Sequence, residues 1–182
     1  HKWYAPDDVK GSQLNNVIIN SLPITTKTLN LKVDGKNLTG NSPKVERGTT
    51  VQLCASCNTK GADVYIYTGQ IVGNSTPTYS QKKATYQKIG TNWYYVVDLP
   101  CNTIEKYSVY FTATKDGYTV QSSEKTLTVT KPNLSHAEIT FPDGNEAAFK
   151  YGTVTDVPTF VVTYKGQTLE KDKDFTITGG GS

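Results

Sequence analysis

The sequence contains three cysteines, Cys54, Cys57 and Cys101, whose thiols could take part in redox or metal chemistry. Cys54 and Cys57 form a C-x-x-C motif, which acts as a redox pair where it opens a helix that lowers the thiol pKa. Here the motif ends a strand-like run, so a redox role is not favoured. A zinc site needs four ligands, and both histidines, His1 and His136, lie in a predicted lead-in and linker. We expect no metal site.

A structural disulfide is the remaining interpretation of the cysteines, and it suits a protein exported to an oxidising compartment. Three thiols allow one bridge and leave one cysteine free. We expect the bridge to join Cys101 to Cys54, because Cys101 should lie at the end of the β-unit where the strand that contains Cys54 begins. Cys57 is the alternative partner.

The sequence offers few residues that could carry out hydrolysis. A nucleophile needs an oriented base, and the two histidines fall outside the predicted β-unit. Asp172 and Asp174 alternate on a strand or turn, where we expect solvated carboxylates. The turn at 143–146 offers two or three oxygens together, fewer than the six or more that calcium prefers. We therefore expect no catalytic residues and no cofactor.

Tyrosines are better candidates for a binding site, because the ring packs against a partner while the hydroxyl forms hydrogen bonds. Val64 and Ile66 fall on the core side of an alternating strand, so Tyr65 and Tyr67 lie on its outer face. Tyr110 points outward from a second strand, which neighbours the first in a two-sheet sandwich. The three rings form a candidate patch for a protein or a glycan. The alternative is that they only stabilise cross-strand pairs.

The elements that carry these residues have the pattern of β-strands. Apolar and polar residues alternate in short runs separated by turn residues, and no window has a helical period. This pattern predicts an all-β, antiparallel two-sheet sandwich, with a long loop at 69–80 as a further place for binding. Strands are predicted at 17–20, 28–33, 49–55, 63–68, 84–89, 93–99, 107–114 and 125–130.

Composition divides the chain into four parts. Residues 1–13 show no period and are expected to be a lead-in, and residues 14–130 form the sandwich with extra N-terminal strands. A Lys-Pro-Asn sequence at 131–133 predicts a domain boundary. Residues 131–178 are then a partial or small second unit, and the Gly-Gly-Gly-Ser tail at 179–182 is linker-like. Strands of the second unit are predicted at 137–141, 160–164 and 174–178, with turns at 142–145 and 165–166.

Five segments carry a resemblance to a known class of module. They are VERGTTVQL (45–53), WYYVVDLP (93–100) and YSVYFTATKDG (107–117) in the first unit, and VVTYKGQTL (161–169) and DKDFTI (172–177) in the second. They resemble the bacterial immunoglobulin-like and fibronectin-III-like repeat modules of adhesins and secreted multidomain enzymes. The resemblance implies an immunoglobulin-like β-sandwich followed by a partial second immunoglobulin-like unit, and a place at the bacterial cell surface or in the secreted fraction.

The function implied by the resemblance is that of a non-catalytic extracellular module, which serves as a structural spacer and as an adhesive or ligand-binding surface. Its partner would be a host or neighbouring surface protein, or a glycan. Two alternatives stay open: a carbohydrate-binding accessory module of a secreted enzyme, and a region that binds a host receptor or immunoglobulin.

Charge and hydropathy disfavour two further classes of partner. The net charge of +3 is spread along the chain without a basic run longer than Lys82-Lys83, so nucleic acid is not expected. No apolar stretch reaches the roughly 20 residues of a membrane span. We expect a monomer, although the short second unit offers a strand edge through which neighbouring molecules could exchange strands and polymerise.

Overall fold

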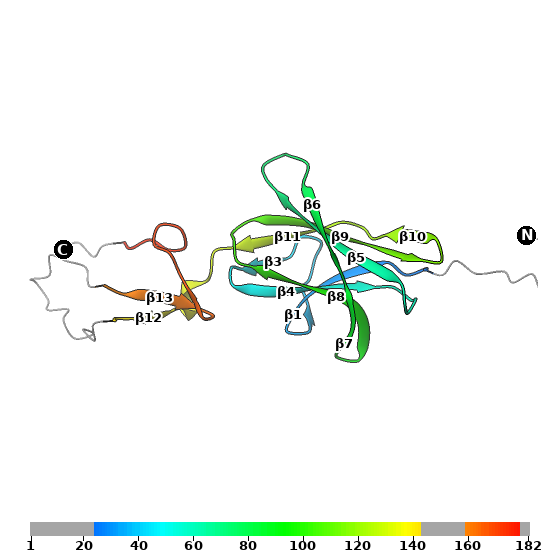
Figure 1. Cartoon of the computed structure of the whole chain (residues 1–182). Helices are drawn as coiled ribbons and strands as arrows, with labels where there is room; N and C mark the ends of the chain where they lie inside the picture. Colours follow the sequence, from blue (N-terminus) through cyan, green and yellow to red (C-terminus); the bar gives the residue numbers. More distant parts are fainter. Residues whose placement is uncertain (1–23, 143–158, 179–182) are drawn as a thin grey trace, which may run out of the picture.

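The computed structural model of the 182-residue chain describes residues 24–142 and 159–178. Within these ranges the regular structure is almost entirely β-strand, with one short 3-10 turn at Leu134–His136 (Figure 1). The predicted all-β class is therefore confirmed. Several predicted segments lie outside the described residues: 1–13, 17–20, 143–146 and 179–182.

The first sheet has the strand order β2-β1-β4-β8-β7, and all its neighbouring strands are antiparallel. The turn from β1 to β2 contains Asp34 and Gly35, both with positive φ, of 50° and 75°. An Asp-Gly pair suits a two-residue hairpin turn because both positions need this conformation. The strands are β1 (Thr28–Val33), β2 (Lys36–Asn37), β4 (Thr49–Ser56), β7 (Thr85–Ile89) and β8 (Asn92–Cys101).

The second sheet has the strand order β3-β11-β9-β5-β6, and β10 pairs with the end of β9. Within it β3 runs parallel to β11, and the other pairs are antiparallel. The strands are β3 (Lys44–Glu46), β5 (Asp63–Ile71), β6 (Thr78–Lys83), β9 (Lys106–Lys115), β10 (Tyr118–Gln121) and β11 (Lys125–Thr130).

The predicted long loop at 69–80 is wrong. Strand β5 continues to Ile71 and β6 begins at Thr78, which leaves a connection of only 72–77. Strand β6 was not predicted because its sequence, TYSQKK, has no alternating apolar face, and five of its six residues are exposed. It is the last strand of the sheet, and none of its side chains is buried in the core between the sheets.

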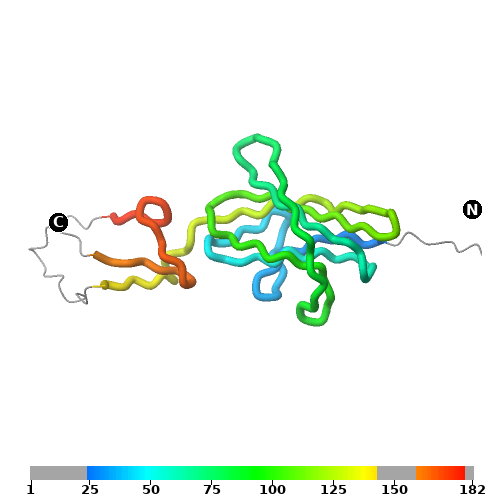
Figure 2. Tube along the Cα trace, viewed as in Figure 1, coloured from blue at the N-terminus to red at the C-terminus, as the bar shows by residue number. Residues whose placement is uncertain are grey.

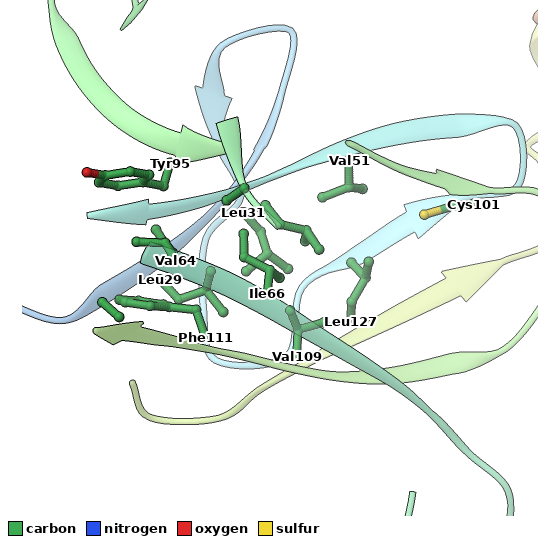
Figure 3. Close-up of a cluster of buried hydrophobic side chains, with 14 of the residues drawn as sticks. Leu29, Leu31, Val51, Val64, Ile66, Tyr95, Cys101, Val109, Phe111 and Leu127 are labelled. Atoms are coloured by element: carbon green, nitrogen blue, oxygen red, sulfur yellow. The ribbon is translucent and has the colours of Figure 1, made fainter. Parts of the chain in front are cut away.

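A single apolar core lies between the two sheets (Figure 3). Val51 and Leu53 contribute to it from the first sheet, and Val109 and Phe111 from the second, all with no exposed surface. They occupy alternate positions along β4 and β9, as the period of two in a strand buried on one side requires. Because the buried faces come from both sheets, neither sheet is stable in this form without the other.

A third, smaller sheet follows the sandwich, with the order β12-β13-β14. Its strands are β12 (Glu138–Thr140), β13 (Val161–Tyr164) and β14 (Gln167–Thr168). Val162, Tyr164 and Leu169 form its small core. In Figure 2 the trace passes from the sandwich to this second unit once, after β11.

The strand predicted at 174–178 is wrong, because Asp174 belongs to a tight turn. Its backbone N–H donates to the Glu170 carbonyl at 2.8 Å, and its carboxylate accepts from the Glu170 backbone N–H at 2.7 Å. The same carboxylate contacts Arg47 of the first unit, so the expectation of a solvated carboxylate at Asp174 is also wrong.

The two units meet at a polar joint, which we define as the contacts between the turn at 46–49 together with Asn102 on one side and the β13–β14 hairpin with Asp174 on the other. Besides the contacts of the Arg47 side chain with Asp174 and with the Thr168 carbonyl, it has three contacts between side chains. The Tyr164 hydroxyl donates to the Glu46 carboxylate, Lys165 Nζ lies 3.4 Å from Thr49 Oγ1, and the Gln167 amide donates to Asn102 at 3.1 Å.

The predicted disulfide between Cys101 and Cys54, or alternatively Cys57, is absent, and all three cysteines are free thiols. Cys101 pairs with Thr49 where β4 begins, whereas Cys54 lies five positions farther along that strand, roughly 16 Å at about 3.3 Å per residue. Cys101 belongs to the main core, but Cys54 packs on the outer face of the sheet. Cys57 follows the end of β4, farther still from Cys101. A bridge needs Cα atoms within about 7 Å.

Candidate functional site

Two of the predicted outer tyrosines meet on the exposed face of the second sheet. Tyr67 on β5 pairs directly with Tyr110 on β9, and their rings stack with centroids 4.6 Å apart and planes 3° apart. Tyr65 lies two residues before Tyr67 on β5, opposite Thr112, and therefore on the same face of the sheet. The three rings expected to form a patch therefore share one surface, with Tyr65 outside the stacked pair.

A fourth ring, Tyr79 on β6, belongs to the same cluster and was missed from the sequence. Its ring centroid lies 5.0 Å from that of Tyr110, with the planes at 74°. Sequence reasoning had placed this residue in a loop, so its strand partner could not be inferred. We call the surface formed by Tyr65, Tyr67, Tyr79 and Tyr110 the tyrosine face.

Gly69 makes the position of Tyr79 possible. The two residues pair across β5 and β6. A Cβ at Gly69 would lie 2.8 Å from the Cβ of Pro77 and 2.9 Å from Cδ1 of Tyr79, closer than real side chains approach. The Tyr79 ring thus covers a strand position where any Cβ would collide with it, a recurrent way in which aromatic residues protect a glycine in a sheet.

The Tyr79 hydroxyl forms a polar cluster with the side chains of Ser108 and Glu124. It lies 2.6 Å from Glu124 Oε1 and 2.8 Å from Ser108 Oγ, and the Ser108 hydroxyl donates to the same carboxylate oxygen. Ser108 lies on the outer face of β9, opposite Gly69, yet it is only 1% exposed. Loss of solvent raises the pKa of Tyr79, and its hydrogen bond to the Glu124 carboxylate raises it further.

A β-bulge sets the position of Glu124. Gln121 pairs with Thr112 and Lys125 pairs with Val109. The three residues between Gln121 and Lys125 therefore lie opposite only two residues of β9, which is a β-bulge. The bulge is closed on Phe111, whose backbone N–H donates to Ser122 Oγ and whose carbonyl accepts from the Ser122 backbone N–H, both at 3.0 Å. Glu124 therefore projects beside the tyrosine face from a fixed backbone.

The chemistry that this surface offers is non-covalent. It presents ring edges, hydroxyl groups and one carboxylate, and Lys83, which pairs with Tyr65 across β5 and β6, forms an exposed ion pair with Asp63 at 2.8 Å. In the described part of the chain, no group of three or more His, Cys, Asp and Glu is arranged to hold a metal ion. Nor does any helix there have the length and apolar character to cross a membrane.

A second aromatic surface lies on the β7–β8 hairpin. Trp93 and Tyr95 share a face of β8, and Tyr95 is the core member, with its hydroxyl accepting from the backbone N–H groups of Gly61 and Ala62. Trp93 is 55% exposed, and its ring stacks on Tyr86 with centroids 5.0 Å apart and planes 16° apart. The sequence had not identified Trp93 as a site.

Comparison with known proteins found no match, either among models of protein families or among curated proteins. The resemblance to bacterial surface modules therefore stays a prediction from the five segments that carry it.

Proposed function

We propose that this chain is a non-catalytic binding module that contacts a protein partner through its tyrosine face. The observation that carries the proposal is the ordered cluster of Tyr67, Tyr110 and Tyr79, held in place by ring contacts and by the Glu124 carboxylate. Aromatic side chains that are already fixed lose little conformational entropy when a partner binds. Because the Tyr110 ring contacts two other rings, the cluster offers edges and hydroxyls, which suit a protein surface better than a sugar ring.

We further propose that the module is immunoglobulin-like and extracellular, on the bacterial cell surface or secreted. The strand order supports this proposal. If β1, β4, β5, β6, β7, β8, β9 and β11 are named A, B, C, C′, D, E, F and G, the two sheets read A-B-E-D and C′-C-F-G, the arrangement of immunoglobulin domains. The joint supports a role as a spacer, because polar side chains on both sides fix one unit against the other.

A binding experiment with matched variants tests the proposed surface. The immobilised chain is exposed to serum, mucus and bacterial surface extract, and retained proteins are identified and then titrated in purified form. A double variant, Tyr67→Ser with Tyr110→Ser, should lose binding at least tenfold, whereas Tyr118→Ser, an exposed tyrosine on the β9–β10 hairpin, should retain it. Circular dichroism checks that each variant is folded. Equal binding by the double variant would rule out the tyrosine face.

A carbohydrate-binding function is the second candidate, and the exposed ring of Trp93 favours it. One side of the indole stacks on Tyr86 and more than half of its surface is free, so a sugar ring could stack on it. The chain has two tryptophans, and Trp3→Phe makes fluorescence report on Trp93 alone. A glycan array followed by fluorescence titration of that variant tests the idea. Binding that persists in Trp93→Ala would exclude this site.

A further inference from the structure

We propose that Glu124 anchors a positively charged side chain, preferably the guanidinium of an arginine, on the protein partner of the tyrosine face. The inference rests on the proposed function and adds the chemistry by which the partner is recognised.

The Glu124 carboxylate is held in one position although the residue is exposed. Its Oε1 atom accepts hydrogen bonds from the hydroxyls of Tyr79 and Ser108. Ser108 is buried, and Tyr79 is fixed over Gly69, so neither donor can easily move away. A carboxylate on a free glutamate side chain would lose rotamer entropy on binding a cation, and this one has already lost it.

The charge of Glu124 has no partner of opposite sign among the described residues. The ion pairs found there join Arg47 to Asp174, Lys83 to Asp63, and Lys173 to Glu170. The second oxygen, Oε2, has no hydrogen-bond donor in the same ranges, and it is free to accept one from another molecule. The site is therefore a fixed negative charge, without an ion-pair partner among the described residues, on an exposed surface.

The surroundings of Glu124 favour a guanidinium. The Tyr79 hydroxyl binds the carboxylate directly, and the Tyr110 ring adjoins that of Tyr79, so aromatic surface lies beside the charge. A cation that pairs with a carboxylate can gain further from contact with a tyrosine ring. Arginine suits such a place because its planar group hydrogen-bonds to carboxylate oxygens and also stacks on aromatic faces, whereas lysine offers a more strongly hydrated point charge.

Titration with short blocked peptides, followed in nitrogen-15 NMR spectra of the chain, tests the proposal without a known partner. Acetyl-Gly-Arg-Gly-amide should cause saturable shifts centred on the amides of Tyr79, Ser108 and Glu124. The same peptide with citrulline, which has the shape of arginine without its charge, should bind several-fold more weakly. Added salt should weaken the arginine peptide more than the citrulline peptide. Equal binding of the two peptides would overturn the proposal.

A variant pair separates recognition from structure. Glu124→Gln keeps an oxygen that accepts from Tyr79 and Ser108 but removes the charge, so it should fold and lose the preference for arginine. Glu138→Gln, an exposed glutamate on β12, should keep it. If Glu124→Gln does not give a folded spectrum, the unmodified chain titrated with acetyl-Gly-Glu-Gly-amide still decides, because shifts as large as those with arginine would contradict the proposal.

The outcome is distinguishable from failure of the proposed function. Suppose that the chain does not prefer the arginine peptide, while the double variant of Tyr67 and Tyr110 still loses binding to its protein partner. The anchor at Glu124 is then wrong, and the proposed binding through the tyrosine face is still supported. If that double variant also binds normally, the proposed function fails as well.

Discussion

The Arg47 guanidinium and the Asp174 carboxylate meet at 2.5 Å between the two units, with 6% and 0% of their side chains exposed. Arg47 also donates to the Thr168 carbonyl at 3.5 Å. In contrast, Arg47 Nε and Asp174 Oδ1 are buried and have no hydrogen-bond partner within residues 24–142 and 159–178. The pair is thus desolvated but not fully satisfied, which makes each charge dependent on the other.

Removal of one member of this pair should destabilise the joint strongly. Asp174→Ala leaves a buried, uncompensated charge on Arg47, which typically costs about 3–5 kcal/mol, and chemical denaturation followed by NMR of the second unit should detect it. The double variant Arg47→Met with Asp174→Leu should recover part of this loss, because it removes both charges, although the Glu170 backbone N–H still loses its acceptor. Lys173→Ala, which breaks an exposed ion pair with Glu170, is the control and should cost less than about 1 kcal/mol. An equally small effect of Asp174→Ala would contradict the role of the pair.

Gly69→Ala should displace Tyr79. The added methyl would lie within 2.9 Å of the Tyr79 ring and closer still to Pro77, so the ring must move, and overpacking of this kind costs about 1–3 kcal/mol. Thermal unfolding measures the loss, and the amide shifts of Ser108 and Glu124 report the displaced ring. Gln70→Ala, at the exposed neighbouring position, is the control. Unchanged shifts in Gly69→Ala would show that Tyr79 does not depend on the glycine.

The three thiols should react in a fixed order. In the folded chain Cys57 should react first with a maleimide or a disulfide reagent, because it is half-buried while Cys54 and Cys101 have no exposed surface. Burial raises the pKa of Cys54 and Cys101 to about 11, so their thiolate fractions stay low until strongly alkaline pH. Mass spectrometry after timed labelling gives the order. Under denaturing conditions all three should react, and only one reactive thiol would instead demonstrate a disulfide.

The free energy of unfolding should fall at alkaline pH. The pKa of Tyr79 is raised by desolvation and by Glu124, and that of Tyr107 by desolvation and by Glu105. The folded chain then holds these protons more tightly than the unfolded chain, so the stabilisation is complete below the ordinary tyrosine pKa of about 10 and is lost as pH rises through the higher folded values. Urea unfolding across this range measures it. Constant stability through the range would disprove the assignment.

The alternation of apolar and polar residues along the strands predicted which side chains face the core and which face outward in most of the sandwich. It placed Val64 and Ile66 in the core, and Tyr67 and Tyr110 on the outer face, because a strand buried on one side has a period of two. The same rule, applied to the residue after Leu53, puts Cys54 on the outer face. The error in the disulfide prediction was therefore avoidable from the sequence.

The features that the sequence did not predict depend on partners far along the chain. Tyr79 lies on a polar edge strand and meets Tyr110 across the sheet, so no local pattern identified it. Asp174 has the local signature of a solvated turn, and its burial is caused by Arg47 in the other unit. Glu124 is fixed by a bulge whose extra residue becomes visible only in the strand register.

The parallel pairing of β3 with β11 has a mechanical consequence. The segment that leads into β1 and the second unit lie at opposite ends of the sandwich, so tension along the chain acts roughly along the strand axes (Figure 1). Strand β11 leads directly toward the second unit, and its hydrogen bonds to β3 lie across the pulling direction. They are consequently loaded in shear and must break together, whereas bonds pulled open from one end break one after another. The sandwich is expected to resist stretching force better than its thermodynamic stability alone would indicate.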